Sequence, residues 1–191
     1  MKKIIWVFGE SATGKKTFIE NILNKSNVEL LSDLNLVEDK INVVQRTINK
    51  NISSFDDKEN EKSRHQQIIE NISNFINNSD DTVLLIKGQS NDMDNRYGNT
   101  LREVAMLFPE IEKEIYLLEV KDMDLLYNRI QNKDWFKVDF ENYSKMFPRE
   151  WIDGAVIRHR EQVYSYQDLG YNITEIDSTN GYKMIDKNKV R

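Results

Sequence analysis

The chain contains no cysteine, so disulfide bonds and thiolate chemistry are excluded. It also has no apolar run close to the roughly 20 residues that a membrane helix needs, so we expect no membrane partner. Basic residues are not in excess, with 27 Lys and Arg against 32 Asp and Glu and a net charge of −5. This balance argues against a protein that coats nucleic acid. The lack of cysteine suits a reducing compartment, and we expect a cytoplasmic protein.

Proline is scarce too, with Pro109 and Pro148 as the only two breaks of that kind. The 191 residues include 39% apolar and 31% charged ones, a composition typical of globular proteins. The length suits a single domain, and no repeat or linker divides it, so we expect residues 1–191 to fold as one unit.

Short apolar runs that alternate with helical patterns indicate the fold class. The predicted strands are Lys3–Phe8, one within Val28–Val44, Thr82–Ile86, Glu114–Val120 and Tyr171–Ile176. For the second strand, Leu34–Val37 and Ile41–Val44 both qualify. The predicted helices are Lys15–Leu23, Asn60–Asn77, Leu101–Phe108, Asp122–Asn132 and Asp139–Leu169, the last with a break at Pro148 and another near Gly154. This order predicts a three-layer α/β domain around a parallel sheet.

One motif lies between the first strand and the first helix. Its residues are Gly9, Glu10, Ser11, Ala12, Thr13, Gly14, Lys15, Lys16 and Thr17. The spacing G-x-x-x-x-G-K is that of a phosphate-binding loop, in which backbone N–H groups surround an anion at the positive end of a helix. The glycines permit close approach, and Lys15 supplies a charge to the phosphates. We expect these residues to bind a nucleoside triphosphate, with ATP favoured.

Lys16 departs from the motif, because the residue after the lysine is normally a Ser or Thr that ligates magnesium. Here the hydroxyl comes one position later, at Thr17. The arrangement resembles the G-K-G-T ending of adenylate kinases, which implies that Thr17 contacts a phosphate. Lys16 then either faces solvent or adds positive charge.

The chain resembles the nucleotide kinases, and thymidylate kinases most of all, in three further segments. Ser63-Arg64-His65-Gln66 resembles a D-R-x-x-H segment, Glu114–Arg129 resembles the fourth strand and the helix that leads into the lid, and Ile173–Thr179 resembles the last strand with its I-D-x-T turn. The resemblance implies a P-loop NTPase fold with five parallel strands in the order 2-3-1-4-5 and a helical lid at about residues 129–162. It places Asp177 and Thr179 near the adenine base and Arg64 on the acceptor. It also leaves a homodimer open.

The end of the third strand departs from that family, because Lys87-Gly88-Gln89 stands where Asp-Arg is usual. Asp92 is our candidate for the magnesium site, with Asp94 as an alternative. We assign Lys87, Gln89, Arg64 and Arg46 to the acceptor.

Lid cations are expected to stabilise the charge of the transferring phosphoryl group. Arg129, Arg158 and Arg160 are our candidates for this catalytic role beside Lys15, and Lys133 and Arg149 lie in the same region.

These observations predict an ATP- and magnesium-dependent phosphotransferase that acts on a small molecule, with a nucleoside monophosphate favoured as the phosphate acceptor. One alternative is a kinase of a hydroxyl group on a nucleoside, sugar or polynucleotide end, which benefits from a carboxylate base such as Asp33, Glu38, Asp39 or Asp92. Another is a non-catalytic ATP-binding regulator or slow ATPase.

Overall fold

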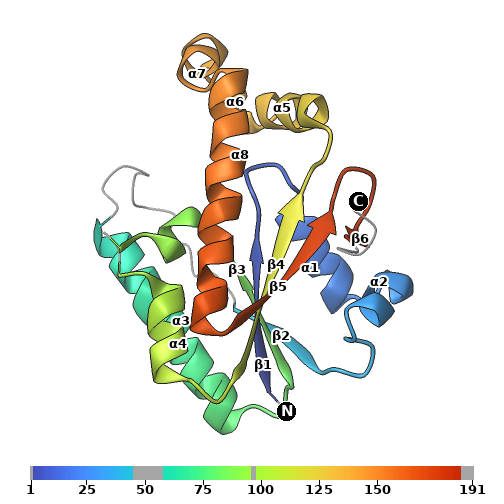
Figure 1. The fold of residues 1–191 in the computed structure, drawn as a ribbon, viewed down its shortest axis with the longest axis vertical. Coiled ribbons are helices and arrows are strands. Elements are labelled where there is room, and N and C mark those ends of the chain that lie inside the picture. Colours follow the sequence, from blue (N-terminus) through green and yellow to red (C-terminus); the bar gives the residue numbers. More distant parts are fainter. Residues whose placement is uncertain (1, 45–57, 96–97, 186–191) are drawn as a thin grey trace.

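The structure, a computed structural model, describes residues 2–44, 58–95 and 98–185, and of residues 58–63 it describes the backbone alone. Six strands form one sheet in the order β2-β3-β1-β4-β5-β6 (Figure 1). Their bounds are β1 Lys3–Phe8, β2 Ile41–Val43, β3 Val83–Lys87, β4 Glu112–Glu119, β5 Tyr171–Asp177 and β6 Lys183–Met184. The first five are parallel to their neighbours, and β6 pairs antiparallel with β5.

The central strand β1 is buried on both faces, as its continuous apolar sequence predicts. Ile4, Trp6 and Phe8 belong to the core on one face, and Ile5 and Val7 belong to the core on the other. This alternation follows from the two-residue period of a strand, and it makes β1 the common wall of both cores.

Helices cover both faces of the sheet, which gives three layers (Figure 1). On one face lie α1 Lys15–Leu23 and α2 Val28–Asp33. On the other face lie α3 Lys58–Asn78, α4 Thr100–Leu107 and α8 Arg149–Tyr164, the last followed by a 3-10 turn, η3, at Ser165–Leu169.

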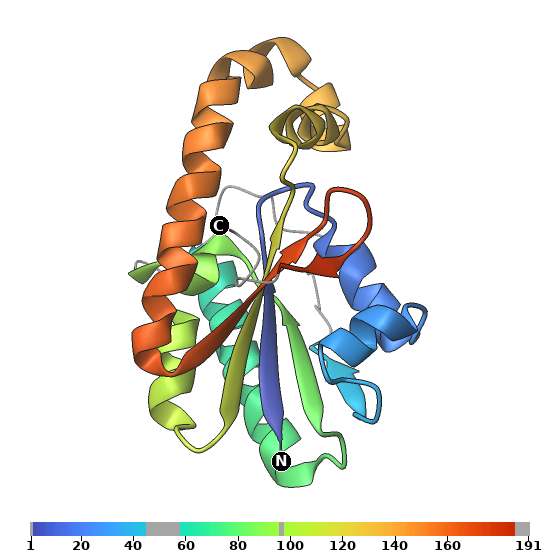
Figure 2. The same ribbon diagram turned by 45° about the vertical axis from the view of Figure 1, so that its right-hand side comes forward.

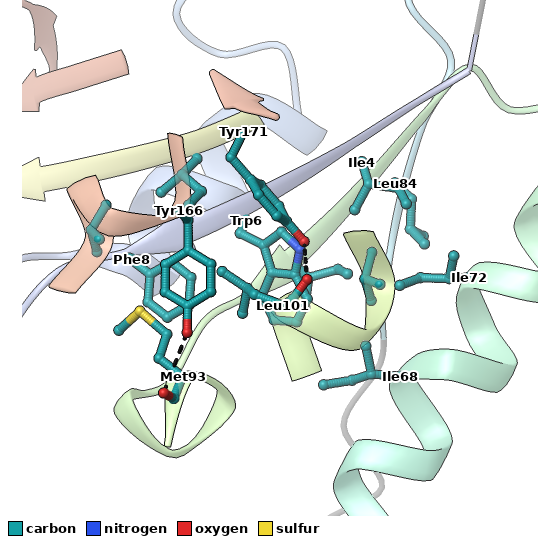
Figure 3. Close-up of a cluster of buried hydrophobic side chains, with 14 of the residues drawn as sticks. Ile4, Trp6, Phe8, Ile68, Ile72, Leu84, Met93, Leu101, Tyr166 and Tyr171 are labelled. Carbon is teal, nitrogen blue, oxygen red and sulfur yellow. Dashed lines mark hydrogen bonds between the residues drawn. The ribbon is translucent and has the colours of Figure 1, made fainter. Parts of the chain in front are cut away.

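Two buried tyrosines in the core that contains Trp6 have hydrogen-bond partners for their hydroxyl groups (Figure 3). The Tyr171 hydroxyl donates to the Leu101 carbonyl at 2.8 Å. The Tyr166 hydroxyl donates to the Met93 carbonyl at 3.3 Å. Both tyrosines are buried, so these bonds join η3 to the turn after β3, and the start of β5 to α4, without leaving either hydroxyl unpaired.

Three short helices lie beyond the carboxyl ends of β1, β4 and β5, and α8 runs from them back along the sheet (Figure 2). They are α5 Met123–Gln131, α6 Asp134–Lys137 and α7 Phe140–Met146. A separate core of Val120, Leu126, Ile130, Phe136 and Ile152 holds them together. Ala12 of the Gly9–Thr17 loop packs against this core, so the loop supports the helices above it.

The predicted helix ends agree with the structure at two positions and differ at a third. The Asp122 side chain caps α5 by accepting from the Leu125 N–H at 3.0 Å. Pro148 is the N-cap residue of α8, as its φ of −63° and missing N–H allow. No break occurs near Gly154, because α8 continues through it.

The structure differs from the sequence prediction around the second strand and at the end of the sheet. Ile41–Val43 forms β2, whereas Leu34–Val37 is not a strand, since Asn35 turns the chain with a φ of 54°. Val28–Asp33, inside the interval searched for a strand, is the helix α2. The predicted sheet had five strands, and β6 is too short, at two residues, for a periodic pattern to reveal it.

No helix among the described residues combines the length and the hydrophobicity that a membrane crossing demands.

Candidate functional site

The Gly9–Thr17 loop connects β1 to α1 at the carboxyl edge of the parallel sheet. β1 pairs with β3 on one side and with β4 on the other, and α1 and α3 lie on opposite faces. Ligands of open α/β sheets bind in the crevice where the chain changes direction in this way. The loop therefore occupies the position at which this architecture binds ligands.

The backbone of the loop requires its two glycines. Gly9 has a φ of 145°, and a Cβ there would lie 2.5 Å from the Leu118 carbonyl oxygen. Gly14 has a φ of 86°, and a Cβ there would lie 2.7 Å from the Tyr182 hydroxyl. Ala12 also has a positive φ, of 66°, although it has a side chain. Three residues of this loop thus have a positive φ, and backbone strain of this kind is concentrated at binding sites.

Thr13 closes the turn from inside. Its hydroxyl donates to the Glu10 carbonyl at 2.9 Å, and its N–H donates to the same oxygen at 3.3 Å. The side chain is buried, so Thr13 shapes the loop and is not exposed for a ligand.

Lys15 lies against the loop that precedes it. Its ammonium donates to the Gly9 carbonyl and to the Glu10 carbonyl, the latter at 2.9 Å. Burial lowers the pKa of Lys15 to about 8; the charge of Glu10 opposes this shift, and repulsion by Lys87 and Lys133 adds to it. A bound anion would relieve this desolvation and repulsion, so the site favours a negatively charged ligand.

A cavity of about 260 Å³, which we call the α1–α3 cavity, opens beside the loop. Its described lining residues are Lys16, Ile19, Glu20, Val43, Val44, Arg64, Ile86 and Lys87. Three of them are cationic, one is acidic and four are apolar. The cavity therefore combines an apolar floor with a positive rim, although the whole chain is acidic.

Arg64 is held rigidly at the wall of this cavity. Its Nε and Nη2 atoms donate to the two oxygens of Asp92 at 2.8 and 2.7 Å, and Nη2 also donates to the Lys87 carbonyl at 3.1 Å. Asp92 is only 2% exposed and accepts a third bond from the Gln89 N–H at 2.8 Å. Such a two-pronged pair fixes the plane of the guanidinium.

The prediction of Asp92 as a metal ligand does not match this geometry, because both of its oxygens are already bonded to Arg64 and Gln89. Asp92 instead positions Arg64. Gln89, expected on the acceptor, begins the 3-10 turn η1 (Ser90–Met93) and forms part of the support for Asp92. Lys87, also expected on the acceptor, lines the α1–α3 cavity. Arg46 lies outside the described residues.

The three arginines expected in the lid have other surroundings. The Arg129 Nη1 and Nη2 atoms donate to the Ser178 and Thr179 carbonyls at 3.1 and 2.8 Å, so Arg129 fastens the turn after β5. Arg158 is exposed. The lid cation whose charge reaches Lys15 is Lys133, at the start of α6.

Arg160 binds two buried carboxylates of the sheet. Its Nη1 atom donates to both oxygens of Glu119 on β4, at 3.1 and 3.2 Å, and Nη2 donates to Glu175 on β5 at 2.8 Å. Glu175 also accepts from the Tyr164 hydroxyl, and Lys121 pairs with Glu119 at 2.5 Å. Arg160 therefore anchors α8 to the sheet. Spacing along the chain could not reveal this role, because the partners lie on two distant strands.

His159 of α8, which the sequence prediction did not assign to the site, lies close to Glu10 of the loop. Its Nδ1 atom lies 3.9 Å from a Glu10 carboxylate oxygen, and its buried Nε2 atom has no hydrogen-bond partner. Burial lowers the pKa of His159, the charges of Glu10 and Glu119 oppose this shift, and Lys15 adds to it. A cavity of about 10 Å³ beside it has room for about one water molecule.

Asp177 and Thr179, expected near a base, line a third cavity, of about 470 Å³, together with Lys121, Asp122, Asn180 and Lys183. Asp177 accepts from the Thr179 N–H at 2.8 Å, and the Thr179 hydroxyl accepts from the Lys121 N–H at 2.8 Å. Tyr182 follows in the same turn, and its hydroxyl donates to the Gly14 carbonyl at 2.9 Å. No sequence signal pointed to Tyr182, which joins this turn to the loop.

Among the residues that the structure describes, no group of three or more His, Asp or Glu side chains is arranged to hold a metal ion. Neither a comparison with models of known protein families nor a search of curated proteins finds a match to this chain.

Replacing Arg160 with alanine would leave Glu119 and Glu175 buried without their main charge partner. We expect the free energy of unfolding to fall by about 3 kcal/mol, the lower end of the range for breaking a buried pair, because the Arg160 side chain is itself partly exposed. Urea denaturation measures this loss. Arg158→Ala, on the same helix but exposed, is the matched control and should change stability by less than about 0.5 kcal/mol. Equal losses in both variants would contradict the anchoring role.

His159 predicts a pH dependence of stability. Its pKa is lowered in the folded state, so below the unfolded value of about 6.5 the unfolded chain binds more protons and stability falls. His159→Gln should therefore flatten the fall in unfolding free energy between about pH 7.5 and about pH 5.5. Urea titrations across that interval measure it, with His65→Gln as the control histidine. An unchanged slope in His159→Gln would refute the assignment.

Proposed function

We propose that the chain is an ATP-dependent phosphotransferase of the P-loop kinase type, acting in the cytoplasm on a small anionic acceptor, with a nucleoside monophosphate favoured. The observation that carries this proposal is the Gly9–Thr17 loop at the carboxyl edge of the sheet. Its left-handed backbone and the desolvated ammonium of Lys15 suit a polyphosphate, and the α1–α3 cavity lies next to it. The order of the parallel strands, 2-3-1-4-5, supports the same fold assignment.

On the donor side, the loop N–H groups and Lys15 would hold the phosphates. Lys15 now donates to two loop carbonyls, and a phosphate would replace these weak acceptors with a charged one. We assign the cavity at Asp177 and Thr179 to the nucleoside part of the donor, because Tyr182 joins that turn to Gly14 at the start of α1.

On the acceptor side, the α1–α3 cavity favours an anion over a neutral hydroxyl compound. Asp33, a candidate base for hydroxyl transfer, is the last residue of α2, whereas Glu38 and Asp39 come just before β2 and so lie toward the amino edge of the sheet, away from the loop. The Asp39 carboxylate accepts there from the Thr82 hydroxyl at 2.6 Å. The fourth candidate, Asp92, is bonded to Arg64. A phosphate acceptor needs no such base, because it is already ionised at neutral pH.

ATP would supply the phosphoryl group: the bond from the γ-phosphorus to the β-phosphate oxygen breaks as an acceptor oxygen bonds that phosphorus, giving ADP and the phosphorylated acceptor. The protein contributes position and positive charge, through Lys15, Arg64 and Lys133. The described residues do not include a set of ligands that suits magnesium. Lys16 replaces the usual hydroxyl residue, and both oxygens of Asp92 are bonded to Arg64. The described residues therefore do not fit a magnesium ion held by the protein itself.

Lys15→Ala tests the loop assignment directly. Loss of a buried charged contact costs about 2 kcal/mol or more, so we expect ATP to bind at least about 30-fold more weakly. Isothermal titration calorimetry measures the affinity, and Lys25→Ala, at the far end of α1, serves as the control. Unchanged ATP affinity in Lys15→Ala would refute the assignment.

A turnover assay separates the proposed activity from its alternatives. ATP consumption is measured with nucleoside monophosphates and with the corresponding nucleosides. Stimulation by monophosphates alone supports the proposal, stimulation by nucleosides alone supports the hydroxyl kinase, and ATP binding without transfer supports the regulator.

The lowered pKa of Lys15 predicts proton uptake when ATP binds. At about pH 9 a group with a pKa of about 8 is mostly neutral, and bound phosphate should restore its charge, so binding should take up most of one proton. Titrations in buffers of different ionisation enthalpy measure this uptake, which should fade toward about pH 7 as Lys15 becomes charged before binding. A proton uptake that does not change between these pH values would contradict the role of Lys15.

A further inference from the structure

Lys15 and Lys16 are neighbours in sequence, but their side chains lie on different sides of α1. Successive residues of a helix point about 100° apart around its axis. The Lys15 ammonium turns back to the loop carbonyls, whereas Lys16 lines the α1–α3 cavity with Arg64 and Lys87. Lys16 therefore stands at the boundary between the loop and the cavity.

Nothing in the local structure of α1 favours a lysine at this position. The first turn of the helix contains no acidic residue, and a cation there opposes the helix dipole at a typical cost of about 0.3–1 kcal/mol. Among the described residues, Lys16 forms an ion pair with Glu20 alone, at 3.7 Å, and the two side chains are 80% and 51% exposed. Exposed pairs of this kind contribute about 0.3–0.5 kcal/mol, so the pair is easily exchanged for a ligand.

The other walls of the cavity define the kind of ligand. Arg64 is held in place, because Asp92 accepts two hydrogen bonds from its guanidinium, and Lys87 at the end of β3 adds a further cation to the lining. Ile19, Val43, Val44 and Ile86 supply the apolar surface. This combination fits a compact phosphomonoester with its dianion on the cationic rim and an apolar or flat body on the floor.

We propose that Lys16 is a substrate-binding residue, which contacts the phosphate of the acceptor together with Arg64. This inference rests on the proposed function. The residue that follows the loop lysine usually ligates a metal ion. In this chain we assign that residue, Lys16, to the acceptor instead. The ammonium then supplies its positive charge to the acceptor phosphate.

The test uses the full chain with AMP-PNP, a non-hydrolysable ATP analogue, filling the loop. Nucleoside 5′-monophosphates and the matching uncharged nucleosides are titrated by calorimetry into the wild type, Lys16→Ala and Lys16→Thr. The control is Lys145→Ala, since Lys145 forms an exposed pair four residues from Glu141 on α7, the same spacing as the Lys16–Glu20 pair.

We expect both Lys16 variants to bind the monophosphate at least about tenfold more weakly, the loss of one charge-assisted contact. AMP-PNP affinity and any nucleoside affinity should stay within about twofold, and Lys145→Ala should change none of them. The Lys16 variants should also be no less stable to heat than the wild type, because removing a cation relieves the helix dipole. If Lys16 had only a structural role, its substitution would instead lower the stability of the protein and leave the monophosphate affinity unchanged.

Two results would overturn the inference. One is equal weakening of AMP-PNP and monophosphate, which would place Lys16 in the donor site. The other is failure of any monophosphate to bind the AMP-PNP complex of the wild type. If AMP-PNP itself does not bind, that result contradicts the proposed function, and the role of Lys16 needs a test of its own. Inorganic phosphate titrated into Lys15→Ala, with and without Lys16→Ala, then tests the cavity: phosphate binding that requires Lys16 supports the inference, and its absence overturns it.

Discussion

The close approach of the loop backbone to its neighbours fixes the geometry of the carboxyl edge. Gly9 lies against Leu118 of β4, and Gly14 lies against Tyr182 of the turn after β5, in both cases too near for a side chain. Gly88, at the end of β3, has the same relation to the Phe8 ring, since a Cβ there would lie 2.5 Å from a ring carbon. Three glycines thus let β1 end in direct contact with the segments beside it, and the cavities form around that contact.

The cations at this edge differ in the strength of their contacts with the protein. Arg160 and Arg129 are engaged with protein groups, a pair of sheet carboxylates and two turn carbonyls. Lys15 and Lys16 have only backbone carbonyls or a weak exposed pair. Because planar guanidinium groups suit fixed bidentate contacts, Arg160 and Arg129 stiffen the framework, whereas the ammonium groups of Lys15 and Lys16 can exchange these weaker contacts for an anionic ligand. Arg64 combines the two roles, since Asp92 positions it at the cavity wall.

Much of the fold could be predicted from local patterns, whereas the role of each charged residue could not. Lys3–Phe8 and the helix Lys15–Leu23 were predicted with the bounds that the structure has, because burial on both faces and a glycine before a helix leave strong local signals. Asp92 was expected near the end of the third strand and does lie there. Its partner, Arg64, is 28 residues away, and nothing local indicates that the pair closes. Tyr182 was missed for the same reason, because its partner Gly14 is 168 residues away in the sequence. The antiparallel strand β6 was missed because two residues are too few to show a periodic pattern.

Lys16 shows how a departure from local rules becomes informative once the surroundings are known. In sequence it is a mismatch to a motif, which suits a degraded site as well as an altered one. In the structure it stands against the helix dipole and beside two further cations, an arrangement that lowers the stability of the free protein. Such a cost is typical of a site organised for a ligand of opposite charge, because binding the ligand removes the repulsion. The described lining of the α1–α3 cavity has three cations against one acid in a chain with a net charge of −5, and this local excess suits an altered anion site better than a degraded one.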